Sequence, residues 1–275
     1  MASMLFRAGL GSLKLRIALM AVSVIALSVA MTVFLVSRDT RLRAEQSIVD
    51  SALDVDTVAK TISSRLLNRE QALSRAAELW PGAQGDAQAF LSQQAVLAVL
   101  FSHVFVAAAD DGRVLAVGSE AGVGGGRRVL LGRSYFEQAR QGRAVAISEP
   151  LDDEGDGQRL GVVLAVPLRD AGGRVTAVLG GVLRTQTDRL LTDSTAASAL
   201  SQDPIETVVT DAAGRIVSHP DPAWLRRDAA ADPRLAEAMA RWRREGAPLE
   251  SQAWAWRTGP QFVAMAAVPQ AGWMV

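Results

Sequence analysis

Residues 161–183 read GVVLAVPLRDAGGRVTAVLGGVL, and this stretch decides the fold. Two apolar runs rich in β-branched residues flank the turn signal DAGGRV, a pattern typical of two antiparallel strands joined by a tight turn. The same signal recurs as DDGRV at Asp110 to Val114 and as DAAGRI at Asp211 to Ile216, again between apolar runs. We therefore predict three β-hairpins, and antiparallel hairpins argue against a doubly wound parallel sheet.

A long helix is predicted before the first hairpin, because residues 37–80 contain neither proline nor glycine. Apolar residues recur there at alternating spacings of four and three, at Ile48, Ala52, Val55, Ala59, Ile62 and Leu66. Such a stripe fits a coiled coil with a second copy of the chain, or packing against the chain's own sheet, and both alternatives stay open. Pro81-Gly82 would end the helix, and a second helix is expected near residues 86–97.

An uncharged apolar run, Ile17 to Val36, is long enough to span a bilayer as a helix. Arg7, Lys14 and Arg16 precede it without an acidic residue, which favours a cytoplasmic N-terminus. The alternative is a signal peptide cleaved after Ser28-Val29-Ala30, but cleavage there would leave an apolar new terminus. The sequence therefore predicts an uncleaved transmembrane anchor.

The long first helix and four stretches together resemble a known family. The four stretches are GRSYFEQARQGRAVAISEP at residues 132–150, the stretch at 161–183, TVVTDAAGRIVSHPDPAWL at 207–225 and FVAMAAVPQAGWMV at 262–275. In this pattern the chain resembles the double Cache extracytoplasmic sensor domains of bacterial transmembrane receptors. The resemblance implies an α+β fold with an N-terminal transmembrane helix, a long stalk helix and two tandem PAS-like antiparallel-sheet modules.

The expected domain organisation has five parts. They are a cytoplasmic N-terminus at 1–16, a transmembrane helix at 17–36, a stalk helix at 37–80, a membrane-distal Cache module at 81–193 and a membrane-proximal Cache module at 194–275. The last module is expected to stop before a second transmembrane helix, which would lead to an output domain such as a cyclase, a kinase or a chemotaxis module.

A ligand site is predicted around Arg133, Tyr135 and Phe136. A guanidinium can bind a carboxylate through two parallel hydrogen bonds, and neighbouring rings exclude water from that pair. The resemblance implies the same roles, because the family's amino-acid-binding members place an arginine before two aromatic residues at this spacing. They also place an acid where Asp153 stands. The alternative is that Tyr135 and Phe136 only pack and that Arg133 is solvated.

The sequence departs from the amino-acid-binding pattern at three positions. Arg128 stands where an aromatic residue is expected, Leu151 where a tyrosine is expected, and Leu183 near where a second acid would bind an ammonium group. The half of the site that would hold an amine is therefore incomplete. An organic acid or another small anion suits such a site better than an α-amino acid.

Other chemistries are disfavoured by composition and spacing. The chain has 29 basic and 29 acidic residues, so no basic excess favours nucleic acid, and its lack of cysteine excludes disulfides and thiolate sites. Residues 152–157, DDEGDG, start like a calcium loop, but Val163 occupies the twelfth position, where a glutamate ligand belongs. With no recognisable catalytic spacing either, we expect no metal, no cofactor and no enzymatic activity within these residues.

The function expected is ligand sensing outside the cytoplasmic membrane of a bacterium, with the bulk of the chain periplasmic. The expected partners are a small organic acid or amino acid, the membrane and a second copy of the chain in a homodimer. The alternative is a membrane-anchored structural or assembly protein whose extracytoplasmic modules bind a protein partner, which an exposed apolar patch would favour.

Overall fold

The computed structural model describes residues 3–82, 85–118, 129–152, 160–185, 206–246, 253–258 and 261–275. The chain divides into two compact units, residues 1–50 and residues 51–275. Helix α1 (Ser3–Glu78) confirms the long helix that was predicted at residues 37–80. The observed helix begins earlier than predicted and ends two residues sooner. Gly82 follows with φ of 90°, a conformation that glycine adopts without strain, so the chain turns there as Pro81-Gly82 predicted.

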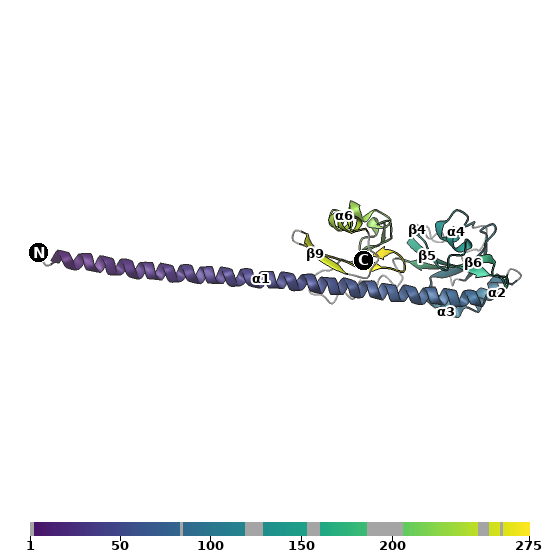
Figure 1. Ribbon diagram of the computed structural model, residues 1–275, viewed down its shortest axis with the longest axis horizontal. Coiled ribbons are helices and arrows are strands. Elements are labelled where there is room, and N and C mark those ends of the chain that lie inside the picture. Colours follow the sequence, from purple (N-terminus) through teal and green to yellow (C-terminus); the bar gives the residue numbers. More distant parts are fainter. Residues whose placement is uncertain are drawn as a thin grey trace. The chain divides into compact units, whose positions relative to one another are not determined.

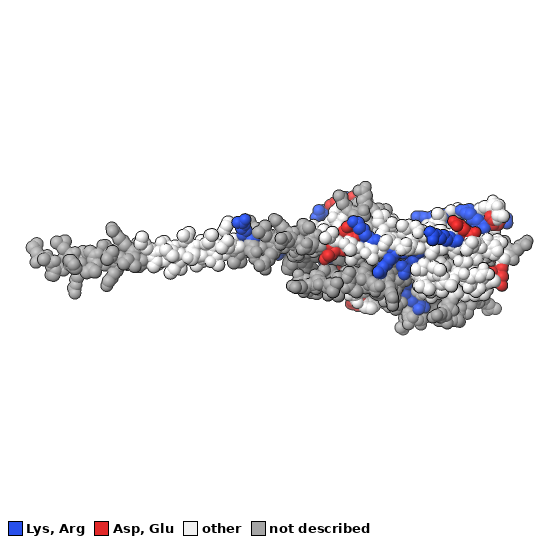
Figure 2. All heavy atoms as spheres, turned by 90° about the horizontal axis from the view of Figure 1, so that it is seen from below, with Lys and Arg blue, Asp and Glu red and all other residues white. Residues whose placement is uncertain are grey.

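In the first unit, the side chains that the structure describes are those of residues 20–35 and 38, and all of them are exposed. The described part of α1 shows an uncharged stretch in the space-filling view (Figure 2). Among the residues that the structure describes, no helix combines the length and the apolar character needed to cross a membrane. The transmembrane helix predicted at 17–36 is thus not confirmed, and the side chains of residues 17–19 and 36 lie outside the described ones.

Two short helices replace the single helix predicted near residues 86–97. They are α2 (Ala87–Ser92) and α3 (Ala95–Leu100). The carboxylate of Asp86 accepts hydrogen bonds from the backbone N–H groups of Gln88 and Ala89 and so caps α2. Gln94, between the helices, has φ of −97° and ψ of 55°, outside the helical region, so one continuous helix cannot form.

A six-stranded antiparallel sheet follows, with strand order β2-β1-β6-β5-β3 and with β4 paired to β5. Its strands are β1 (His103–Ala108), β2 (Val114–Gly118), β3 (Ala146–Ile147), β4 (Leu151–Asp152), β5 (Leu160–Arg169) and β6 (Val175–Arg184). The pairs β1–β2 and β5–β6 are both antiparallel, which confirms the first two predicted hairpins. Helix α4 (Ser134–Arg140) lies on one side of this sheet and α1 on the other (Figure 1).

A four-stranded antiparallel sheet has the order β11-β12-β7-β8, and β9 pairs with β10 in a separate hairpin. The strands are β7 (Val209–Thr210), β8 (Ile216–Ser218), β9 (Trp254–Thr258), β10 (Gln261–Met265), β11 (Ala267–Val268) and β12 (Trp273–Met274). The helices here are η2 (Pro222–Trp224), η3 (Ala229–Ala231) and α6 (Ala236–Arg244). The pair β7–β8 confirms the third predicted hairpin. The module boundary predicted between residues 193 and 194 lies outside the described residues, so the two modules remain a prediction.

Helix α1 shares one buried cluster with both sheets. Ala59, Ile62 and Leu66 of its apolar stripe are at most 2% exposed and lie in the same cluster as Leu164 of β5 and Val217 of β8. This part of the stripe therefore packs against the chain's own sheets, which was one of the two alternatives. Ile48 lies outside the described side chains, and a dimer stays a prediction.

Candidate ligand-binding site

Helix α4 places the two predicted aromatic residues on the sheet. Tyr135 is 4% exposed and Phe136 is fully buried, and both belong to a second cluster with Phe105, Val163 and Val178. These three strand residues alternate with the residues that face α1, so the cluster covers the opposite face of the six-stranded sheet. We call it the α4 face. The packing of Tyr135 and Phe136, which was the alternative to a ligand site, is therefore present, and a ligand role for the two rings stays a prediction.

Arg133 occupies the position just before α4. Its backbone is extended, with φ of −77° and ψ of 125°, and its carbonyl accepts the hydrogen bond from Glu137 N at 3.0 Å that opens the helix. Its side chain is exposed, in contrast to the buried Tyr135 two residues later. The structure thus brings Arg133, Tyr135 and Phe136 together at one helix start, with the cation at the surface and the rings below it.

Asp153, the fourth predicted site residue, lies outside the described residues, and so does Arg128 among the positions noted for departure from the family pattern. The segment leading to Asp153 is well defined. Ser148 is buried and pairs with Val163 twice: its N–H donates to the carbonyl at 2.8 Å, and its Oγ accepts from the amide at 2.8 Å. Ser148 therefore fixes residues 148–150 beside β5, immediately before β4.

Two further residues of the α4 face, His103 and Arg184, were not predicted from the sequence as ligand residues. His103 shares a face with Phe105 because strand side chains alternate, and it pairs in register with Val182, a member of the α4-face cluster. Arg184 lies two residues after Val182 on the same face, opposite Gly161. Both are partly buried at the edge of an otherwise apolar face. Alternation along β1 and β6 was the available signal, but the pairing that makes them neighbours appears only in the fold.

The polar side chains of this region can hold an anion. A guanidinium donates hydrogen bonds and never accepts them, a phenol can donate one, and an imidazole can donate one or two. In the described part of the chain, no group of three or more histidine or acidic residues has an arrangement that could hold a metal ion. The α4 face therefore combines apolar rings with donors suited to a small carboxylate.

Comparison with known families gives one clear match. The sequence profile of the family described as Cache domain (dCache_1) matches residues 37–275. No curated protein sequence matches the chain.

Solved structures with a similar fold include ligand-binding domains of chemoreceptors. The Pseudomonas fluorescens chemoreceptor CtaA in complex with L-isoleucine shares 20% identity, with 86% of this chain and 93% of that chain covered and a TM-score of 0.58. The Pseudomonas aeruginosa PAO1 amino acid chemoreceptor PctB in complex with L-Arg shares 15% identity, with 84% and 93% covered and a TM-score of 0.60. At these identities the likeness shows a shared fold.

Proposed function

Because the chain belongs to the Cache domain family, we propose that it is the extracytoplasmic sensing region of a bacterial transmembrane receptor that binds a small carboxylate-bearing molecule on the α4 face. The observation that carries the proposal is the start of α4, where exposed Arg133 precedes two buried rings by two and three residues. A carboxylate held by the guanidinium would lie at the edge of an apolar surface, where charge-assisted hydrogen bonds gain strength because water is partly excluded.

The ligand class follows from the charges near the rings. Arg184 and His103 add a second group of donors to the α4 face, and among the described residues of β1, β5 and β6 no acid shares that face. The similar chemoreceptor structures hold L-isoleucine and L-Arg, whose ammonium groups need an acceptor. We therefore propose an organic acid, preferably one with two carboxylates, with Asp153 contacting a hydroxyl or amino group where the ligand has one.

The membrane anchor, the periplasmic location and the dimer belong to the same proposal. Large apolar side chains from Met20 to Leu35 are each at least 51% exposed, which is unfavourable in water and favourable in lipid. In this proposal residues 81–193 form the membrane-distal module, residues 194–275 form the proximal one, and an output domain such as a cyclase, a kinase or a chemotaxis module lies beyond them. The proposed output domain is tested directly by the residues that follow Val275 in the full-length gene.

The ligand proposal is tested by thermal shift of the purified 275-residue chain in detergent against a panel of organic acids and amino acids. A ligand that binds only the folded state raises the melting temperature by mass action. With the stabilising compound in hand, Arg133→Ala should weaken binding by roughly thirty-fold to several hundred-fold, because it removes a bidentate charge-assisted contact. Tyr135→Phe should weaken it less, since it loses one neutral hydrogen bond and keeps the ring.

A matched control is Arg140→Ala on the same helix, since Arg140 pairs with Glu137 at 2.6 Å on the exposed side of α4. Its affinity should equal that of the parent. If Arg133→Ala binds the stabilising compound as tightly as the parent while it remains folded, the site assignment is wrong. Preferential stabilisation by α-amino acids over dicarboxylates would overturn the proposed ligand class.

A further inference from the structure

Each of the three hairpin turns contains an ion pair between an aspartate and an arginine, two residues apart in the first turn and four apart in the others. Arg113 Nε lies 2.5 Å from Asp111 Oδ2, Arg174 Nε lies 3.3 Å from Asp170 Oδ2, and Arg215 Nε lies 2.8 Å from Asp211 Oδ2. In each turn the aspartate also accepts the backbone N–H of its arginine. The pair therefore closes each turn locally, which is the ordinary role of aspartate in tight turns.

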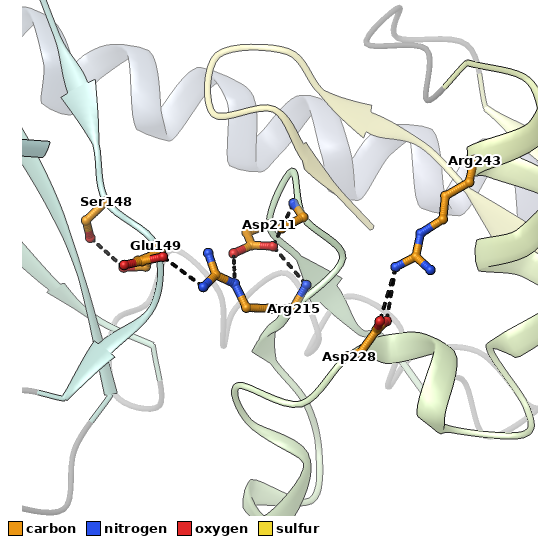
Figure 3. Close-up of polar contacts among 7 residues, drawn as sticks. Ser148, Glu149, Asp211, Arg215, Asp228 and Arg243 are labelled. Carbon is orange, nitrogen blue, oxygen red and sulfur yellow. Dashed lines mark hydrogen bonds and ion pairs between the residues drawn. The ribbon is translucent and has the colours of Figure 1, made fainter. Parts of the chain in front are cut away.

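The third turn differs because its arginine also reaches the six-stranded sheet region. Arg215 Nη1 lies 2.8 Å from Glu149 Oε2, so the guanidinium spans two carboxylates from segments far apart in sequence (Figure 3). Arg113 and Arg174 pair with the aspartates of their own turns and are 69% and 81% exposed, whereas Arg215 is 39% exposed. Within the described residues, the third turn alone thus links the two sheets through this motif.

Both ends of the bridge are held in place. The Asp211 side chain is 7% exposed and accepts hydrogen bonds from the backbone amides of Ala213 and Arg215. It also accepts one from Arg215 Nε, so Asp211 orients the guanidinium independently of Glu149. Glu149 follows Ser148, which is bonded to β5 and whose Oγ donates to the Glu149 carbonyl at 2.7 Å. The hydrogen bonds that Arg215 donates to Glu149 and Asp211 raise the pKa of its guanidinium above the ordinary value, so it stays charged.

We propose that the Arg215–Glu149 bridge couples the segment before β4 to the β7–β8 hairpin, so that a change in one alters the stability of the other. Residues 148–150 lead into β4, whose Leu151 packs against the α4-face cluster, and a ligand on that face that displaced β4 would change the position of Glu149. Arg215 would pass that change to the four-stranded sheet, which shares a buried cluster with α1. The signalling role rests on the proposed function, whereas the coupling itself does not.

The coupling is tested without a ligand by amide hydrogen exchange on the 275-residue chain in detergent. Glu149→Gln removes the arm between the sheets and leaves the Asp211–Arg215 pair intact, so the third turn stays closed. We expect exchange at the amides of Ala213 and Arg215 in the third turn to rise about two- to five-fold, the range expected for a partly exposed ion pair. Arg215→Gln should raise exchange at the Ser148 and Val163 amides by a similar factor.

The matched control is Arg174→Gln, which removes the same pair from the second turn and should leave exchange at Ser148, Val163 and Ala213 unchanged. The double variant Glu149→Gln/Arg215→Gln should exchange at Ser148 no faster than Arg215→Gln alone, because the two changes remove one interaction. In about 1 M salt, amide exchange in the third turn of the parent should approach the rate of the Glu149→Gln variant, because the Debye length falls to about 3 Å and the ion pair is screened.

Additive effects in the double variant, or equal effects of Arg174→Gln and Arg215→Gln at Ser148, would overturn the coupling. These outcomes concern the bridge and are independent of whether any organic acid binds. If no organic acid stabilises the chain but the Glu149→Gln and Arg215→Gln effects are non-additive, the coupling stands. The proposed ligand class is then wrong.

Discussion

The two faces of the six-stranded sheet are built from alternate residues of the same strands, yet they carry different side chains. Toward α1, strands β5 and β6 present the leucines Leu164, Leu168, Leu179 and Leu183, each at most 1% exposed. Toward α4, the same strands present smaller residues, namely Val163, Ala165, Val178 and Val182. The strands thus present leucines to the α1 face and nothing larger than valine among the buried residues of the α4 face, while each face also receives rings, such as Phe101 on the first and Phe105 and Phe136 on the second.

If the proposed ligand binds on the α4 face, the two faces divide stability and recognition between them. Leucine against a long helix gives close packing that needs no polar group, and such a face tolerates few changes in volume. The α4 face carries Tyr135 and Phe136 over small strand residues, and strand register places His103 and Arg184 at its edge. The comparison therefore predicts that truncation to alanine costs more stability on the α1 face, where the side chains are larger, than on the α4 face.

The largest contrast is expected between Leu164→Ala and Val163→Ala, neighbours on β5 that point to opposite faces. Leu164→Ala should lower the free energy of unfolding by about 2–5 kcal/mol, because it opens a cavity against the α1 side of the sheet. Val163→Ala should cost about 1–3 kcal/mol, since it removes fewer buried methyl groups. Urea denaturation followed by circular dichroism measures both losses in unfolding free energy. An equal or larger loss for Val163→Ala would contradict the proposed difference between the two faces.

A second contrast uses the adjacent glycines of β6. A Cβ at Gly181 would lie 2.5 Å from the ring of Phe101, and a Cβ at Gly180 would lie 2.2 Å from the ring of Phe105, so each glycine makes room for one ring. Either glycine-to-alanine change should cost about 1–3 kcal/mol of unfolding free energy by overpacking.

The two faces can then be separated by size compensation. Phe105→Leu should recover part of the loss in Gly180→Ala, and Phe101→Leu should recover part of the loss in Gly181→Ala, as measured by melting temperature. Recovery across the pairs, for example of Gly181→Ala by Phe105→Leu, would mean that the faces are not independent.

A smaller effect is expected at Glu70 of α1, where burial raises the pKa of the carboxyl above its ordinary value of 4.5. A carboxyl with a raised pKa in the folded state binds its proton more tightly there than in the unfolded chain. Its contribution to stability is therefore present below pH 4.5 and is lost as the pH rises through the folded pKa. Glu70→Gln should raise the free energy of unfolding at pH 7 by less than about 1 kcal/mol. It should also make that free energy depend less on pH above pH 4.5. A stability difference from the parent that is constant between pH 4 and pH 7 would exclude this origin.

The smallest change in stability is expected for Arg133→Ala. Its side chain is exposed, so the free energy of unfolding should change by no more than about 0.5 kcal/mol, in contrast to its large effect on ligand binding. Chemical denaturation of the ligand-free chain measures this directly. A loss above 1.5 kcal/mol would show that Arg133 stabilises the start of α4 and would weaken its assignment as a ligand residue.

The sequence by itself determined the local elements. The three turns and the long helix are specified by residues close together in the chain, namely aspartate and glycine between apolar runs, and a stretch without proline or glycine. The arginine and the two aromatic residues at 133, 135 and 136 could be recognised for the same reason, because they lie close together in the sequence. The helix predicted near residues 86–97 was wrong in detail, because the break at Gln94 has no strong local signal.

Only the tertiary structure decided which residues far apart in the sequence meet. The stripe of α1 fits two partners by its spacing alone, and the buried Ile62 and Leu66 are assigned to the chain's own core by long-range packing. Strand register places His103 beside Val182, and the approach of two segments places Glu149 beside Arg215. Neither neighbour is encoded by local spacing, because register and docking depend on the free energy of the whole buried surface and not on any short stretch.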